Sequence, residues 1–138
     1  MAHLAIDYGS KYIGLAVSDP DGVLAFPAGV IANNDKTIDV IMDLIKEKSI
    51  SVIVIGDSVD EHGNKNQIAK YATGFGNEIK EKSGLPVHYI NESFTSSHAR
   101  FMFDDTKIKG RIDASAAALI LQRFLDKQKQ TTIDNFNI

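Results

Sequence analysis

Three short runs of β-forming residues, separated by tight-turn signals, begin the chain and constrain its fold more than any other feature. The runs are His3–Ile6, Tyr12–Val17 and Val23–Ile31, and clusters that contain Gly, Asp and Pro lie between them. Strands joined by connections this short pair in an antiparallel sense. The sequence therefore predicts a three-stranded antiparallel meander at the start of the fold.

A helical pattern and two further strand patterns follow the meander. Apolar residues recur at helical spacing from Ile38, and residues 33–35 offer Asn and Asp side chains as an N-cap. Ser51–Ile55 and Leu85–Ile90 have the pattern of short strands, with a second helical pattern from Ile68 to Ile79 between them. Strand, helix and strand in this order predict a parallel βαβ crossover, and hence an α/β fold with a mixed five-stranded sheet flanked by helices.

The last third of the chain predicts a short helix, a basic loop and a long helix. We expect the short helix at Thr95–Phe103, the basic loop at residues 104–111, and Asp113 at the start of the final helix. From Lys127 the sequence is polar, which predicts a frayed tail over residues 127–138. No composition shift or internal repeat divides the chain, so we expect one domain over residues 1–138.

The composition excludes several functional classes. With 43% hydrophobic and 24% charged residues the chain is typical of a globular protein, and without cysteine it has no disulfide, thiolate ligand or thiol nucleophile. No apolar stretch approaches transmembrane length and no signal-peptide pattern is present, so we expect a cytoplasmic protein without a membrane partner. The net charge of −3 means that phosphate binding must depend on a local cluster such as Lys107, Lys109 and Arg111.

Three acidic residues occupy positions from which they could form one site. Asp7 ends the first strand, Glu92 follows the strand that ends at Ile90, and Asp113 precedes the apolar face of the last helix. Ligand sites in α/β sheets collect at the strand ends, so packing of the last helix beside the first strand would bring the three carboxylates together. Taken singly, each acid also has a structural interpretation as a turn residue, a solvated loop residue or a helix cap.

The chemistry of such a site follows from its oxygen ligands. Carboxylates without a His or Cys partner favour Mg²⁺ or Mn²⁺ over zinc, and two such ions support hydrolysis of a phosphodiester without a protein nucleophile. Gly9 and Lys11, close to Asp7, are candidate substrate-binding residues together with the basic cluster. We therefore interpret Asp7, Glu92 and Asp113 as metal-binding catalytic residues of a site for phosphoryl displacement.

The sequence resembles the YqgF/RuvX family, whose members are described as Holliday-junction-resolvase-like proteins and as nucleases that mature the precursor of small-subunit ribosomal RNA. The resemblance spans nearly the whole chain, and its most specific segments are Asp7-Tyr8-Gly9-Ser10-Lys11-Tyr12-Ile13-Gly14, Ala16-Val17-Ser18-Asp19-Pro20, Ile112-Asp113-Ala114, Ala116-Ala117 and Ile120-Leu121-Gln122. It implies a ribonuclease H-like fold, with Asp7, Glu92 and Asp113 in the family's metal-binding catalytic positions.

The middle of the chain departs from the family pattern, first after the fourth strand, where Gly56-Asp57-Ser58-Val59 replaces the usual Gly-x-Pro stretch, and again at residues 91–93. Where the family usually has Asp-Glu-Arg, this chain has Asn91-Glu92-Ser93, so the central acid is kept while a neighbouring acid and an Arg are absent. An Arg can hold phosphate through two parallel hydrogen bonds, whereas a Ser hydroxyl offers one donor. The departure leaves open whether activity is lowered or lost, and it favours the alternative of a non-catalytic RNA-binding homologue.

The segment around Asp7 is also compatible with nucleotide binding. The Asp7, Gly9, Lys11 and Gly14 pattern resembles the phosphate-binding hairpin of the sugar kinase, actin and Hsp70 superfamily, although those proteins bind ATP between two such domains. For a nuclease, carboxylate-bound metal does not distinguish an RNA precursor from branched DNA. A junction resolvase would require a homodimer with two sites, whereas a nuclease that trims ribosomal RNA could act as a monomer.

Overall fold

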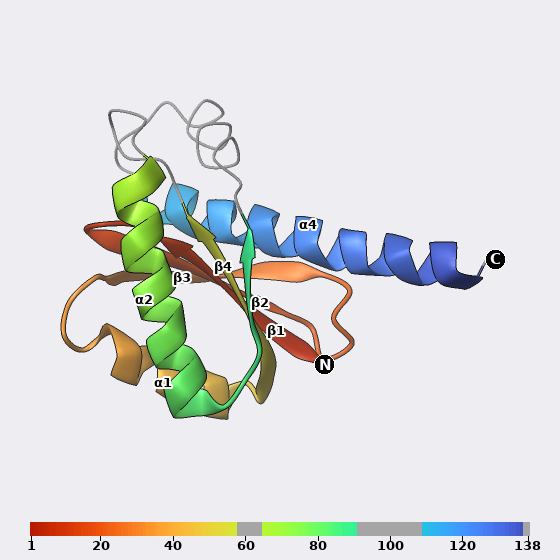
Figure 1. Cartoon of the computed structure of the whole chain (residues 1–138), viewed down its shortest axis with the longest axis horizontal. Helices are drawn as coiled ribbons and strands as arrows, with labels where there is room; N and C mark the ends of the chain where they lie inside the picture. The colour runs from red at the N-terminus through yellow and green to blue at the C-terminus, as the bar shows by residue number, and fades with distance from the viewer. Residues whose placement is uncertain (58–64, 91–108, 137–138) are drawn as a thin grey trace.

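The computed structural model describes residues 1–57, 65–90 and 109–136, and Figure 1 shows how their elements are arranged. The elements occur in the order β1 (Ala2–Tyr8), β2 (Tyr12–Ser18), β3 (Ala25–Ala32), α1 (Thr37–Glu47), β4 (Ile50–Asp57), α2 (Lys65–Ser83), β5 (Val87–Ile90) and α4 (Lys109–Phe136). None of the helices in these ranges is both long enough and apolar enough to cross a membrane.

The strands form one five-stranded mixed sheet with the order β3-β2-β1-β4-β5. β1 pairs antiparallel with β2, and β2 pairs antiparallel with β3, which confirms the predicted meander. β1 pairs parallel with β4, and β4 pairs parallel with β5 across the α2 crossover. β1 is therefore the central strand, with an antiparallel neighbour on one side and a parallel neighbour on the other.

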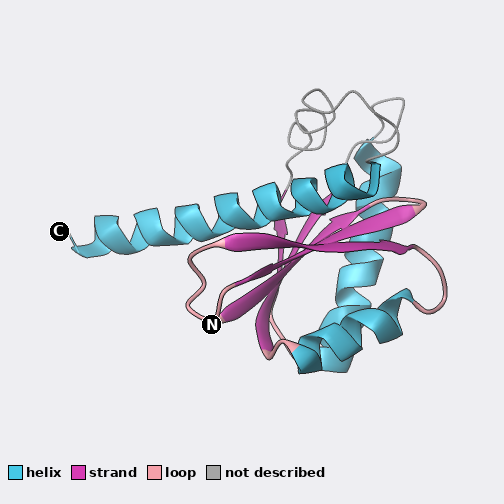
Figure 2. Ribbon diagram, turned by 180° about the vertical axis from the view of Figure 1, so that it is seen from behind, coloured by secondary structure: helices cyan, strands magenta, loops and turns pink. Residues whose placement is uncertain are grey.

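Helices cover both faces of the sheet, with α1 and α2 on one face and α4 on the other (Figure 2). Because side chains alternate along a strand, β1 contributes to two separate cores. Leu4 and Ile6 pack with the buried residues of α1 and α2, whereas Ala5 packs with the apolar stripe of α4 that includes Ala117 and Leu121. On the α4 face, burial lowers the pKa of His3 below its ordinary value.

Gln122 attaches α4 to the connection between β2 and β3. Its Oε1 accepts a hydrogen bond of 3.0 Å from the Ala25 N–H, and its Nε2 donates one of 3.0 Å to the Val23 carbonyl. The connection is itself shaped by Asp19, whose carboxylate accepts hydrogen bonds from the backbone N–H groups of Leu24 and Val23. These two bonds lower the pKa of Asp19. The Asp19 turn and Gln122 together fix the position of α4 along the sheet.

The N-terminus of α1 differs from the sequence prediction. The residue before the helix is Lys36, and no side chain caps it. Asn34 instead accepts a hydrogen bond of 2.9 Å from the Lys36 N–H, while the Thr37 hydroxyl accepts one from the Asn34 N–H and donates one to the Ala32 carbonyl. The predicted cap within residues 33–35 is therefore wrong, because these side chains stabilise the turn before the helix rather than its first N–H groups.

Both ends of α4 also differ from the sequence prediction. The helix begins at Lys109 rather than Asp113, so Asp113 lies in its second turn and Arg111 in its first turn instead of a basic loop. The helix continues to Phe136, where a frayed tail was predicted from Lys127, and its C-terminal part extends past the sheet (Figure 1). Residues 127–130 are Lys and Gln, which are good helix formers, so a helix that packs on the sheet can propagate through them although they are polar.

Some predictions concern residues that the structure does not describe. The short helix predicted at Thr95–Phe103 and most of the basic loop, up to residue 108, lie outside the described residues. So do Asn91, Glu92 and Ser93.

Contact between α4 and β4 at Gly56 gives a test of how closely the two elements pack. A methyl group built on Gly56 would lie 2.5 Å from Ile120 Cδ1 and 3.3 Å from its Cγ1. We expect Gly56→Ala to lower the free energy of unfolding by about 1–3 kcal/mol through overpacking, and Ile120→Val to lower it by about 0.5–1.5 kcal/mol through loss of a buried methyl group. Urea unfolding at pH 7 measures both.

The double variant decides whether this contact is the cause. Because valine lacks the Cδ1 atom, Gly56→Ala should cost less in the Ile120→Val background than in the wild type. Distant, independent sites add to within about 0.3–0.5 kcal/mol. Additive losses in the double variant would contradict close packing of α4 on Gly56.

Candidate functional site

Asp7 is an acidic residue buried in the central strand of the sheet. Its side chain is 6% exposed, and by the alternation of β1 it shares the α4 face with Ala5. It is the next-to-last residue of β1, close to the edge where the parallel strands β1 and β4 end. The sequence prediction of a carboxylate at this strand end agrees with where the structure places Asp7.

Glycine stands on both sides of Asp7 in the sheet. Asp7 is in register with Gly14 of β2 and with Gly56 of β4. Residues in register on neighbouring strands lie on the same face, so no side chain from either strand flanks the carboxylate. Ile120 of α4 covers the Gly56 side. This arrangement leaves the immediate flanks of Asp7 in the sheet without competing side chains.

Burial sets the electrostatic requirement of this carboxylate. An ionised carboxylate away from water is costly unless charge or hydrogen-bond donors face it, and burial alone favours its protonated form. A divalent cation beside Asp7 would stabilise the ionised form. Such a cation would approach from the α4 face, since the next residue, Tyr8, points into the α2 core, where its ring centroid lies 5.1 Å from that of Phe75.

β5 ends level with Asp7 in the sheet. Ile90, the last residue of β5, is in register with Gly56, which is in register with Asp7. Glu92 follows Ile90 by two residues and lies outside the described residues. β5 therefore ends at the same edge of the sheet as β1, two strands from Asp7. The position of the Glu92 carboxylate stays a prediction.

Helix α4 carries Asp113 on the same face of the sheet as Asp7. Position 113 precedes Ala116, Ala117 and Ile120 by three, four and seven residues, a spacing that puts all four on one stripe of a helix. Ala116 and Ala117 are fully buried and Ile120 is 2% exposed, so the described part of this stripe faces the sheet. The structure describes the backbone at Asp113 but not its side chain, and its contact with Asp7 stays a prediction.

The turn between β1 and β2 is braced by Asn33. Its Nδ2 donates a hydrogen bond of 2.9 Å to the Gly9 carbonyl, and its N–H donates one of 2.9 Å to the Lys11 carbonyl. A methyl group built on Gly9 would lie 2.5 Å from the Tyr12 carbonyl oxygen, so glycine is needed there for the turn itself. The Lys11 side chain is exposed on this turn. Substrate contacts of Gly9 and Lys11 stay predictions.

The predicted basic cluster spans the start of α4. Lys107 lies outside the described residues, whereas Lys109 and Arg111 are in the first turn of the helix. A helix N-terminus carries partial positive charge from its free N–H groups. The charges of basic residues there add to this positive charge. The described backbone thus places Lys109 and Arg111 at the start of α4, and phosphate binding by the basic cluster stays a prediction.

The donor set of the site fits a hard divalent cation. Among the described side chains there is no group of three or more His, Cys, Asp or Glu that could hold a metal ion. Two of the three predicted ligands are outside that set, namely Glu92 and the side chain of Asp113. Carboxylate oxygens without nitrogen or sulfur partners match the preference of Mg²⁺ and Mn²⁺.

Tyr12 is a residue near the site to which the sequence analysis gave no role. It begins β2, lies two residues before Gly14 and therefore shares the face of Asp7. Its side chain is 47% exposed. Alternation along β2 gives Tyr12 the same face as Gly14, but only the register of β2 with β1 brings it near Asp7.

Comparison of the whole chain with known families and proteins gives consistent matches. The family model described as "RuvX: Holliday junction resolvase" matches residues 1–127. A Sulfurihydrogenibium protein is 40% identical over 129 residues, covering 90% of this chain and 89% of that protein. A Dictyoglomus turgidum protein is 35% identical over 133 residues, covering 91% and 94%. Both bear names that describe pre-16S rRNA nucleases.

Two solved structures share the fold at low sequence identity. T. thermophilus RuvC in complex with a Holliday junction substrate aligns with a TM-score of 0.61 at 14% identity, covering 94% of this chain and 96% of that chain. The yeast mitochondrial Holliday junction resolvase Ydc2 aligns with a TM-score of 0.55 at 14% identity, covering 97% and 82%. The predicted ribonuclease H-like fold is confirmed.

Proposed function

The chain belongs to the RuvX family of Holliday junction resolvases, and we propose that it hydrolyses nucleic-acid phosphodiesters with Mg²⁺ or Mn²⁺ held by Asp7, Glu92 and Asp113. The observation that carries this proposal is the buried Asp7 carboxylate on the central strand, which lies between Gly14 of β2 and Gly56 of β4. Its burial, its oxygen-only chemistry and its place at a strand end all suit a ligand of a hard cation.

The three acids would act by holding metal and orienting substrate. Asp7 would supply a fixed ligand, because it is part of a strand paired on both sides. Asp113 would approach from α4, whose position is set by Gln122, and Glu92 from the chain beyond β5. Divalent ions held by these residues would supply charge that lowers the pKa of an attacking water and stabilises a leaving oxygen. The reaction would then require no nucleophilic side chain from the protein.

Phosphate binding would come from the positive segment at the start of α4. Lys109 and Arg111 are in the first turn of α4, where free N–H groups attract anions, and Lys107 precedes them in the sequence. Lys11 and Gly9, which lie on the turn that Asn33 holds after Asp7, would also contact the sugar-phosphate backbone of the nucleic acid. Contacts of this kind position the nucleic acid without reading its sequence.

The relatives support an RNA substrate, and the fold is shared with enzymes that cut branched DNA. We propose that the substrate is a precursor of small-subunit ribosomal RNA, with a Holliday-type junction as the competing substrate. Processing of ribosomal RNA would place the protein in the cytoplasm. We propose a single catalytic domain over residues 1–138, active on RNA as a monomer, or as a homodimer if the substrate is a junction.

Replacing the carboxylates one at a time tests the catalytic assignment. We expect Asp7→Asn, Glu92→Gln and Asp113→Asn each to lower kcat/KM by about 100-fold or more, because metal-based charge stabilisation is worth several kcal/mol and each ~1.4 kcal/mol is tenfold in rate. Wild-type cleavage should stop in EDTA and return with Mg²⁺ or Mn²⁺. The assay compares a labelled single-stranded precursor RNA with a four-way DNA junction.

Asp43→Asn provides the matched control, since Asp43 is exposed on α1 and lies on the opposite face of the sheet. It should cleave as the wild type does. Wild-type cleavage that persists in EDTA would refute the metal mechanism, and full activity of Asp7→Asn would remove Asp7 from it. A wild type that binds RNA but cuts neither substrate would identify the chain as a non-catalytic RNA-binding homologue.

Replacing Lys107, Lys109 and Arg111 together with Ala tests the basic segment. We expect weaker binding and a smaller dependence of affinity on salt, because each lost phosphate contact on a single strand removes ~0.7 from the slope of log K against log salt concentration. Fluorescence anisotropy across a salt series, in EDTA to prevent cleavage, measures the slope.

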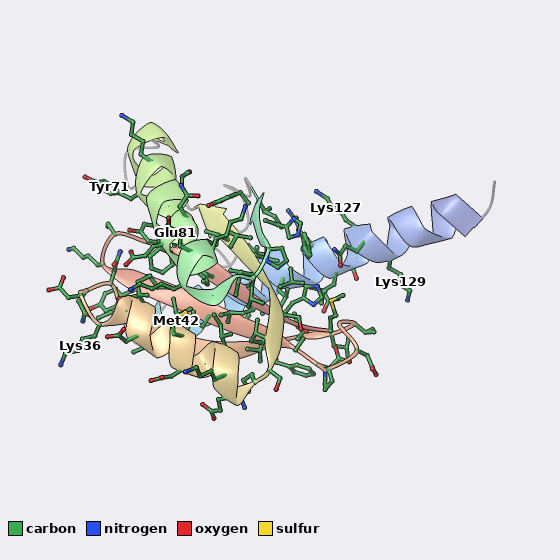
Figure 3. All side chains as sticks on the ribbon, turned by 60° about the horizontal axis from the view of Figure 1, so that its bottom comes forward. Lys36, Met42, Tyr71, Glu81, Lys127 and Lys129 are labelled. Atoms are coloured by element: carbon green, nitrogen blue, oxygen red, sulfur yellow. The ribbon has the colours of Figure 1, made fainter. Side chains whose placement is uncertain are left out.

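A control variant with equal charge change separates this effect from net charge. Lys36, Lys46 and Lys48 are exposed on or beside α1, and Lys36 projects from the side of the molecule away from α4 (Figure 3). Their replacement with Ala should leave the salt slope close to that of the wild type. Equal slopes for all three proteins would exclude the basic segment from the binding surface.

A further inference from the structure

Tyr12 places a half-exposed aromatic ring beside the proposed catalytic carboxylate. Tyr12 and Gly14 lie on the same face of β2, and Gly14 is in register with Asp7. With a strand spacing of ~4.8 Å and a rise of ~3.4 Å per residue, the Cα atoms of Tyr12 and Asp7 are about 8 Å apart. A ring at this distance is within reach of the nucleoside next to a phosphate held at Asp7.

The exposure of this ring contrasts with the rest of its strand. Tyr12 is 47% exposed, whereas Ile13 is fully buried and Leu15 is 3% exposed. A single exposed aromatic residue is ordinary on a protein surface. Tyr12 differs because it lies next to a buried acid, and because the exposed Lys11 precedes it directly. An aromatic face beside a cation is the combination by which proteins bind an unpaired nucleotide.

The backbone that carries the ring is held in place before any ligand binds. Asn33 makes two hydrogen bonds of 2.9 Å to the carbonyls of Gly9 and Lys11. Tyr12 itself is paired with Ala32 of β3. A preorganised surface loses less conformational freedom on binding, so more of the contact energy appears as affinity.

We propose that Tyr12 stacks on an unpaired nucleobase adjacent to the scissile phosphate and makes the protein select substrates that are single-stranded there. This inference rests on the proposed nuclease function and adds a substrate class to it. A base in a continuous duplex is stacked on its neighbours and has no free face for a protein ring. A single strand, or the branch point of a junction, does present such a face.

Binding measured without cleavage tests this proposal. Oligoribonucleotides that carry 2-aminopurine at successive positions, in EDTA, should show quenching by the wild type at one position. We expect Tyr12→Ala to abolish that quenching and to weaken binding of the single strand by about 5- to 150-fold. Tyr12→Phe should behave as the wild type, since it keeps the ring. Binding of a blunt duplex of the same length should be unchanged in both variants.

Tyr71→Ala is the matched control, because Tyr71 is 61% exposed and projects from α2, on the face of the sheet opposite to α4 (Figure 3). It should bind both nucleic acids as the wild type does. Unchanged single-strand affinity and quenching in Tyr12→Ala would overturn the proposal, and so would an equal loss of duplex binding.

The same samples, supplied with Mn²⁺, separate this inference from the proposed function. Cleavage by the wild type together with unaltered binding by Tyr12→Ala would refute stacking and leave the nuclease function intact. A wild type that binds no nucleic acid and cuts none would refute both. Tyr12-dependent binding without cleavage by the wild type would uphold stacking and refute the nuclease function.

Discussion

Helix α4 packs against the sheet through small residues, and the position of the candidate site depends on this contact. Ala116 and Ala117 of α4 are fully buried on the side of the helix that faces the sheet, and Gly56 of β4 leaves space for Ile120. Small side chains on both elements allow the backbones to approach closely. Gln122 then fixes the helix along the sheet through hydrogen bonds to the connection between β2 and β3. Any displacement of α4 would move Asp113 relative to Asp7.

The surroundings of Asp7 join the stability of the fold to its chemistry. A carboxylate on the central strand interrupts an apolar core, which is unfavourable for folding unless a cation or hydrogen bonds offset the desolvation. Because glycines are in register with it on both sides, neither β2 nor β4 places a side chain directly beside it. The same features suit a metal ligand, because they hold one oxygen donor rigidly at a strand end. The proposed metal site would explain a residue that packing alone would disfavour.

The sequence was sufficient to predict the antiparallel meander and the parallel βαβ unit, because periodicity and short connections leave few possible arrangements for each. The pairing of β1 with β4, which joins the two units into one sheet, was not predicted, because it connects segments far apart in the sequence. Asp7 was placed correctly at the C-terminal end of the first strand, because the apolar run ends there. Its position on the α4 face of the sheet comes from the structure. Helix boundaries were less predictable. The start of α4 was placed at Asp113 rather than Lys109, because an acidic residue before an apolar face resembles an N-cap. Tyr12 was not predicted, because its position near Asp7 depends on the register of β2 with β1, which a single strand pattern does not specify.

Anomalous scattering from a crystal grown with Mn²⁺ tests the convergence of the three acids most directly, because it locates the ion and its ligands without an assay. The account predicts Mn²⁺ density at the β1 end on the α4 face, coordinated by Asp7 together with Glu92 and Asp113. Density bound by other residues, or an Asp7 carboxylate without Mn²⁺ at a saturating concentration, would contradict it.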